Sequence, residues 1–427
     1  MTGPVRAHVP NQGGFRAAFG SLRLREFRWL FISNLAFFLA MGGQMLVRQV
    51  LAYQLTGSAL FLGTVTLVMA IAMLLLSPFG GVLADRRDRR NLIVFAQCGS
   101  FAGEFAILLL LVSGRLEAWH LLVSSFLLGC TFPMSMPARN AMVVNIVGKE
   151  ALVGAMALSM GMHNMTRVVG PALAGFLIPF IEIEGVYSIN VSLYLVAILS
   201  MFRVSRVKPT QAMRNTPVLE SLVGGFRYVG RNRLVLFLLV YGLVPLILAA
   251  PLQNLGVVFT EEVWDVGPLG LGILNAAIGL GGVAGTVAVA MRAPGAGRQR
   301  MMVTTALLFG GSLTLAAFSP WFAPALILVF AGHAFAATFS ILNNSAIQLL
   351  IPDEVRGRVS SLMMMSFSLP MFGTFPVSAA AEAYGAPLAV GIASALGLVF
   401  AFTFYLLNKD LRSLDARVAE TRLDVAE

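Results

Sequence analysis

The chain has 427 residues, of which 58% are hydrophobic and only 12% are charged, and its formal net charge is +10. Soluble domains have roughly 45–50% apolar and about 25% charged residues, so this composition excludes a soluble enzyme or binding domain. A multi-span membrane protein can carry this much apolar surface because lipid replaces water around it. The basic residues are scattered over many short loops, so nucleic-acid binding is a poor explanation of the charge.

Apolar runs of about 20 residues recur along the chain after a polar, arginine-rich segment at residues 1–28. The first run is too long for the apolar core of a signal peptide, so we expect no cleavable signal sequence. The runs predict an all-α integral membrane protein with about twelve transmembrane helices, at roughly 29–52, 60–82, 92–113, 120–143, 153–178, 185–203, 233–258, 267–290, 301–319, 321–348, 358–381 and 386–407.

The polar stretch at 204–232 divides these helices into two six-helix halves, 29–203 and 233–407, which are followed by a tail at 408–427. A weak internal repeat supports the division, since Asn140–Glu150 matches Asn344–Glu354 at an offset of 204 residues. Duplicated halves are how many secondary transporters build a binding site between them near the middle of the membrane.

Arginine and lysine crowd the tails and the even-numbered loops, and only one of them, Arg115, falls in the opposite loops. Those opposite loops carry acidic residues instead: Glu117, Glu182, Glu184, Glu261, Glu262 and Asp265. The positive-inside rule therefore predicts a multi-pass protein of a bacterial-type inner membrane with both termini in the cytoplasm.

The loop after the second helix is the densest cluster of charge, reading Gly81-Val-Leu-Ala-Asp85-Arg86-Arg-Asp-Arg89-Arg90. It closely resembles motif A of the major facilitator superfamily, with Asp88 where that motif usually has glycine. Gly170-Pro171-Ala-Leu-Ala-Gly175 in the fifth helix resembles the core of motif C, which is associated with exporters, although Thr166 and Ala157 replace its upstream glycines.

Three further segments resemble the branch that contains enterobactin-type siderophore exporters and macrolide-efflux-like proteins: Leu55-Thr-Gly-Ser-Ala, Pro137-Ala-Arg139-Asn140 and Pro352-Asp-Glu-Val-Arg356-Gly-Arg358-Val. The resemblance spans most of residues 21–407 and implies the major facilitator fold and a secondary active exporter. We assign a gating role to Gly81, Asp85, Arg86, Arg89, Arg90, Arg139, Gly170, Pro171, Arg356 and Arg358. For the charged loop, the alternative is a turn that only sets the topology. For Gly170-Pro171, it is ordinary packing of small residues.

Polar and ionisable side chains within the spans are candidate substrate contacts, because each is costly unless it is paired or hydrated. Gln44 and Arg48 share one helix face, as do His163 and Arg167, so these four would form a cationic wall, with Asn164 at a similar depth. The alternatives are snorkelling of Arg48 and Arg139 to the interface, a structural ion pair for Arg167 and a packed, hydrogen-bonded His163. The second half offers neutral and apolar candidates: Asn254, Asn344, Phe367 and Met371. A cationic wall facing an apolar one favours an amphiphilic or anionic ligand.

Energy coupling is expected to be proton antiport, which the family resemblance implies, with Glu104 and His163 as candidate carriers. Glu104 is the carboxylate inside the first half, and Arg167 has two competing anionic partners, Glu104 and an acidic substrate. An organic-anion uptake symporter and a non-transporting sensor or scaffold remain alternatives. No metal-ligand spacing, catalytic set or nucleotide loop is apparent, so we expect no enzyme activity and no cofactor. The expected partners are a small-molecule substrate, protons and membrane lipids, for a monomeric protein.

Overall fold

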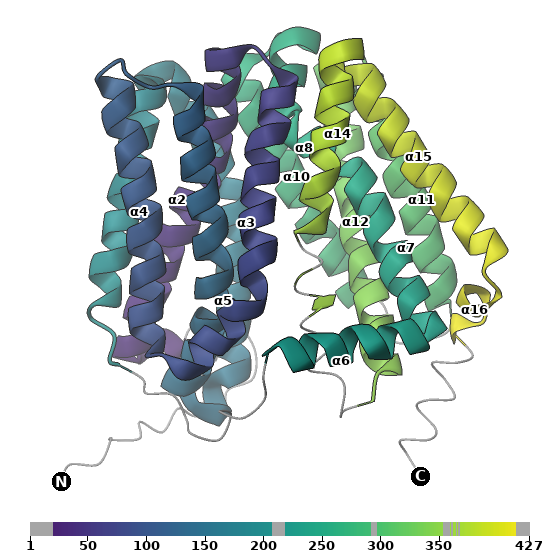
Figure 1. Cartoon of the computed structure of the whole chain (residues 1–427), viewed down its shortest axis with the longest axis horizontal. Coiled ribbons are helices and arrows are strands. Elements are labelled where there is room, and N and C mark those ends of the chain that lie inside the picture. The colour runs from purple at the N-terminus through teal and green to yellow at the C-terminus, as the bar shows by residue number, and fades with distance from the viewer. Residues whose placement is uncertain are drawn as a thin grey trace.

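The computed structural model describes residues 20–206, 218–291, 297–352, 359, 362, 363, 365 and 368–415, and these residues form helices and no strand (Figure 1). The first half contains η1 (Ser21–Arg23), α2 (Arg25–Thr56), α3 (Ala59–Arg86), α4 (Arg89–Val112) and α5 (Ala118–Met201). A connecting helix, α6 (Val218–Arg231), leads to the second half. That half contains α7 (Arg233–Ala249), α8 (Pro251–Asn254), α9 (Gly256–Val258), η3 (Phe259–Val263), α10 (Gly267–Ala290), α11 (Arg298–Ala317), α12 (Phe322–Leu350), α14 (Leu369–Tyr384), α15 (Ala386–Leu407) and α16 (Lys409–Arg412).

Helix α5 has 84 residues and as one straight helix would extend for about 126 Å, several times the thickness of a bilayer. It therefore consists of three successive spans. The chain reverses at Gly148 and Glu182, where φ is 71° and 60° in place of helical values. Ten helical stretches among the described residues are long and apolar enough to cross a membrane, and one of them, Gly154–Met201, contains the reversal at Glu182 and so crosses twice. Together with the shorter α14, these stretches give twelve crossings in two six-helix halves and confirm the predicted fold class.

Polar side chains start the helices that follow the tight turns. Ser58 accepts a hydrogen bond from the amide of Phe61 at the start of α3, and Asp88 accepts one from Asn91 at the start of α4. Gly57 takes a left-handed conformation, with φ of 60°, and this ends α2. The seventh span departs from the expected single helix at 233–258, because α7 ends at Ala249 and Pro251 has no N–H to continue its ladder.

The halves pack on each other through two helix pairs, α10 against α5 and α14 against α3. Helix α6 lies crosswise to the spans at one end of the bundle (Figure 1), which we call the α6 end. The turns at Gly57 and Glu182, together with η3, lie at the opposite end.

Candidate functional site

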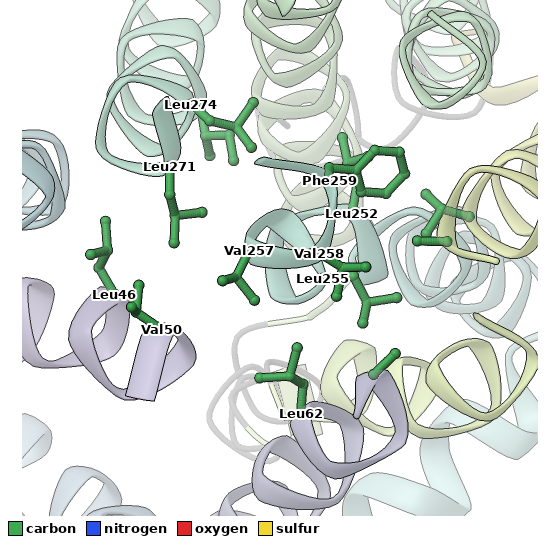
Figure 2. Packing of buried hydrophobic residues seen from close by; sticks show 14 of the residues in the cluster. Leu46, Val50, Leu62, Leu252, Leu255, Val257, Val258, Phe259, Leu271 and Leu274 are labelled. Carbon is green, nitrogen blue, oxygen red and sulfur yellow. The ribbon is translucent and has the colours of Figure 1, made fainter. Parts of the chain in front are cut away.

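The halves are sealed together at the opposite end by a shared hydrophobic cluster. The described residues form four clusters of buried hydrophobic side chains, and this is the one that draws on both halves. Figure 2 shows Leu46 and Val50 of α2 and Leu62 of α3 gathered with Val257 of α9 and Leu271 of α10. The other three clusters each stay within one half or its flanking helices, so among the described residues apolar packing joins the halves at the opposite end.

Three hydrogen bonds add a polar latch at the same end. The hydroxyl of Tyr53 donates to Glu262 of η3, so the end of α2 is tied to the second half. Glu382, near the end of α14, accepts from the Ser58 hydroxyl at 3.2 Å and from the Leu60 amide at 3.1 Å. Its carboxylate therefore stabilises the N-terminus of α3 across the boundary between the halves.

Small residues let the backbones of the two halves approach closely near this seal. A Cβ atom added to Gly175 of α5 would lie 2.6 Å from the Cα of Gly272 on α10. Gly170 makes a similar approach to Gly42, but that contact lies within the first half. The backbone torsions of α5 stay helical at Gly170 and Pro171, so in this segment the residue that meets the partner half most closely is Gly175.

A buried polar network occupies the interior of the first half. Glu104 of α4 accepts hydrogen bonds from Gln44 and Arg48 of α2 and from the Ser124 hydroxyl at 2.9 Å. Arg48 also donates to Ser124 at 2.9 Å and Ser125 at 3.0 Å.

The side chains of this network are enclosed by the first half itself. Arg48 is 5% exposed, Glu104 is 1% exposed and Gln44 is fully buried, and Tyr194 closes the network by donating to Gln44. Gln44 and Arg48 therefore point into the first half, and the neighbouring Met45 is the accessible residue of this turn, at 39% exposed.

The ion pair answers the question of which cation neutralises Glu104: the partner is Arg48 and not Arg167. The helix ends in the structure explain this pairing, because Arg48 and Glu104 each lie eight residues before the last residue of their helix, whereas the spans expected at 29–52 and 92–113 did not show it. Two parallel spans of the same half place such residues at the same depth. Sequence reasoning missed the serine and tyrosine members, since hydroxyl groups in membrane helices commonly bond to their own backbone.

Three polar candidates in the middle span of α5 are at least partly accessible. Arg167 and Asn164 are exposed and His163 is half-buried, although all three lie well inside the span. Arg167 is within electrostatic range of His163 and also of His333 on α12 of the other half. The described part of the chain provides no acidic partner for Arg167, so this guanidinium is free to meet an anionic group between the halves.

The chain as a whole matches the model of the transmembrane secretion effector family over residues 16–426. It belongs to this family of major facilitator transporters. It is 22% identical to the staphyloferrin A transporter of Staphylococcus aureus, over 83% of this chain and 89% of that protein. It is 27% identical to the enterobactin exporter EntS of Shigella boydii, over 73% of this chain and 71% of that one. The fold is similar to that of the nucleoside transporter NupG, with a TM-score of 0.72 and 13% identity over 90% of this chain and all of that one.

Membership in this family confirms that the protein is a membrane transporter of small molecules and not an enzyme. It also confirms the resemblance to siderophore and macrolide exporters, since a macrolide efflux protein of Streptococcus pyogenes is among its relatives. Within the described residues, no group of three histidine, cysteine, aspartate or glutamate side chains is placed to hold a metal ion.

Arg139, assigned to gating, is enclosed within the first half of the transporter. Its side chain is 2% exposed and donates to the Asn34 amide oxygen. The guanidinium lies 4.1 Å from the ring centre of Phe37 and 5.5 Å from that of Phe38, whose ring packs 4.4 Å from the ring of His163. The rings of Phe37 and Phe38 thus stabilise the charge of Arg139 by cation–π contact, and Phe38 also contacts His163.

The motif A loop of the transporter is described in part. Asp88 caps α4, and Arg90 at the start of that helix donates to the carbonyl of Phe202 at 3.1 Å, within the first half. Arg89 is the first residue of α4. The surroundings of Gly81, the side chains of Asp85 and Arg86, and the whole of Arg356 and Arg358 lie outside what the structure describes, so their gating role stays a prediction.

The candidates of the second half take different positions. Asn254 is 8% exposed and donates to the Thr374 hydroxyl at 3.1 Å, which fixes α8 against α14. Asn344 on α12 is exposed and Met371 on α14 is half-buried, so both are accessible to a ligand. Phe367 lies outside the described residues.

Proposed function

We propose that this transporter exports an anionic, amphiphilic small molecule of the siderophore or drug type by alternating access, coupled to proton entry. The observation that carries the proposal is Arg167, a solvent-accessible guanidinium deep in α5 and within electrostatic range of His333 in the other half. A mid-membrane cation needs an anion or water as its partner, and an anionic substrate between the halves meets that need.

Apolar side chains beside this cation favour an amphiphile over a small hydrophilic anion. Met45 is 39% exposed and Met165 is 54% exposed, and Met371 of the other half is partly accessible. The flexible thioether of methionine adapts to ligands of different shape, which suits bulky apolar groups. Relatives named for staphyloferrin A, enterobactin and macrolides support export of such a molecule.

The direction of transport follows from orientation. Arginines crowd the loops of the α6 end, and the positive-inside rule favours a cytoplasmic location for that end and both termini. The hydrophobic seal and the Glu382 latch then face the outside, and Arg167 is reached from the cytoplasm. This is the state in which an exporter loads its substrate.

His163 is the coupling residue that we favour within this proposal. It is half-buried beside Arg167, and its Nδ1 has no hydrogen-bond partner among the described residues. Glu104, the other candidate, is held by Arg48, Gln44 and Ser124 away from the accessible face. An imidazole can gain and lose a proton, whereas the guanidinium of Arg167 beside it keeps its charge.

The test is substrate flux in proteoliposomes with an imposed proton gradient. We expect outward transport of an anionic substrate that Arg167→Ala abolishes and Arg167→Lys retains with weaker apparent affinity, because a point charge replaces a bidentate fork. A neutral hydrophobic substrate should still be transported by Arg167→Ala. Arg115→Ala, which removes an exposed arginine of the opposite loops, is the matched control.

Each outcome of this assay decides between the alternatives. Accumulation in the reverse direction would identify an uptake symporter, and absence of flux for every substrate would favour a sensor or scaffold. Equal loss of anionic and neutral transport in Arg167→Ala would overturn the role of Arg167 as the anion contact.

A further inference from the structure

Helix α6 has the character of a helix that lies at a membrane surface. It runs crosswise to the spans (Figure 1), and its apolar residues differ in exposure. Val229 is 6% exposed and packs into the second half, whereas Val223 is 48% exposed and Phe226 is 60% exposed. Arg227 and Arg231 are exposed on the same helix. Exposed aromatic and aliphatic side chains interleaved with arginines are typical of interfacial helices.

An open pocket of about 660 Å³ lies where α6 meets α7, lined by Tyr228, Arg231, Asn232, Arg233, Leu234 and Asp410. Its volume is within the roughly 300–1,000 Å³ common for small-ligand sites. Asn232 is fixed there, because it accepts from the Val235 amide at 3.2 Å and donates to the Tyr228 hydroxyl at 3.3 Å. The lining is therefore an ordered corner between two helices.

The pocket is electropositive. Its lining holds two guanidinium groups, those of Arg231 and Arg233, and one carboxylate, that of Asp410. Arg233 is also the first residue of α7, a 17-residue helix whose N-terminal amides carry partial positive charge. Guanidinium groups and helix N-termini together are suited to a phosphate oxygen.

The pocket borders the part of the protein that faces lipid. Helix α15 ends at Leu407, which is 85% exposed, and Phe402 and Leu406 are 48% and 47% exposed. Asp410 of the pocket lining follows Leu407 by three residues. An acyl chain lying along these apolar side chains would thus have its head group at the level of Arg231 and Arg233.

We propose that this pocket binds the phosphate of an anionic phospholipid, whose acyl chains lie against the exposed end of α15. Charge complementarity selects this occupant, since two arginines outnumber the single acid and each basic side chain near a membrane surface attracts anionic lipid. A zwitterionic lipid would bring a second cation next to the arginines. The site is separate from the space around Arg167, so the lipid is a structural ligand and not the transported substrate.

The experiment is native mass spectrometry of the purified full-length protein titrated with phosphatidylglycerol or phosphatidylcholine. We expect tighter binding of phosphatidylglycerol by wild type, and about 30-fold weaker binding by Arg231→Gln/Arg233→Gln. The charge-matched control, Arg115→Gln/Arg300→Gln, removes two exposed arginines outside the pocket and should bind like wild type. Arg231→Gln alone, at the exposed end of α6, should show about 5-fold weaker binding and guards against misfolding of the double variant.

Equal binding of phosphatidylglycerol by the pocket variants and wild type would overturn the proposal, and so would equal binding of the two lipids by wild type. Competition by millimolar inorganic phosphate would identify a site for free phosphate and would also overturn it. Because lipid binding is measured without transport, failure here is distinct from failure of the proposed export function.

Discussion

Replacement of Arg48 by methionine should strongly destabilise the first half. Arg48 is 5% exposed and Glu104 is 1% exposed, and the change leaves the carboxylate with Gln44 and Ser124 as its described donors. Removing one partner of a buried ion pair costs about 3–5 kcal/mol, because an uncompensated charge stays behind. The unfolding equilibrium should therefore shift by roughly two to four orders of magnitude.

A double-mutant cycle with Glu104→Gln isolates the pair. The double variant has no charge to neutralise, so it should recover most of the lost free energy of unfolding, since neutral replacement of a buried ion pair is often tolerated. The assay is denaturant-dependent unfolding of the detergent-purified protein, followed by tryptophan fluorescence. Arg167→Met is the matched control and should change stability little, because Arg167 is exposed.

Two results would refute this reasoning. One is a loss below about 1 kcal/mol for Arg48→Met, since that is the size expected of an exposed pair. The other is rescue of a destabilised Arg167→Met by Glu104→Gln, which would make Arg167 the true partner of Glu104.

Three further changes test the ends of the bundle. Glu382→Gln removes a charge from the N-terminus of α3 and should shift the equilibrium by about 1–2 kcal/mol toward opening of the opposite end. A membrane-impermeant reagent added from outside should then label a Met45→Cys reporter faster, and unchanged labelling would refute the latch. Cysteine at Asp88 should be labelled only from the cytoplasm and cysteine at Glu262 only from outside, and the reverse pattern would invert the topology. Asp85→Asn should preserve expression and lower the rate of transport in the same proteoliposomes. Full activity would mean that the motif A loop has no gating role.

The number of spans and their grouping could be predicted from sequence because each span has to satisfy its own backbone in lipid. The constraint is local, so twenty apolar residues between charged loops suffice to identify a helix. The boundaries were less certain where local signals conflict. The seventh span was expected to be one helix to residue 258, but helix α7 ends at Ala249 because Pro251 follows, and the apolar stretch continues to Asn254.

The candidate site was only partly predictable, because helical spacing tells which residues share a face but not what that face meets. Gln44 and Arg48 do share a face, as expected, yet that face turns to Glu104 and the serines of α5 inside the first half. His163 and Arg167 share the face that solvent reaches. The two pairs look alike in sequence and differ only in their neighbours.

The sequence by itself determined that lipid surrounds the protein, how many helices it has, how they divide into halves and which family it resembles. Hydropathy and short loop motifs are properties of contiguous residues, so they can be recognised without the fold. Only the tertiary structure decided which cation pairs with Glu104 and which end is sealed. It also decided that a carboxylate of α14 caps α3 and that α6 and α16 enclose one pocket. These outcomes depend on contacts between helices distant in sequence, where packing and the rotation of each helix about its axis choose the partner.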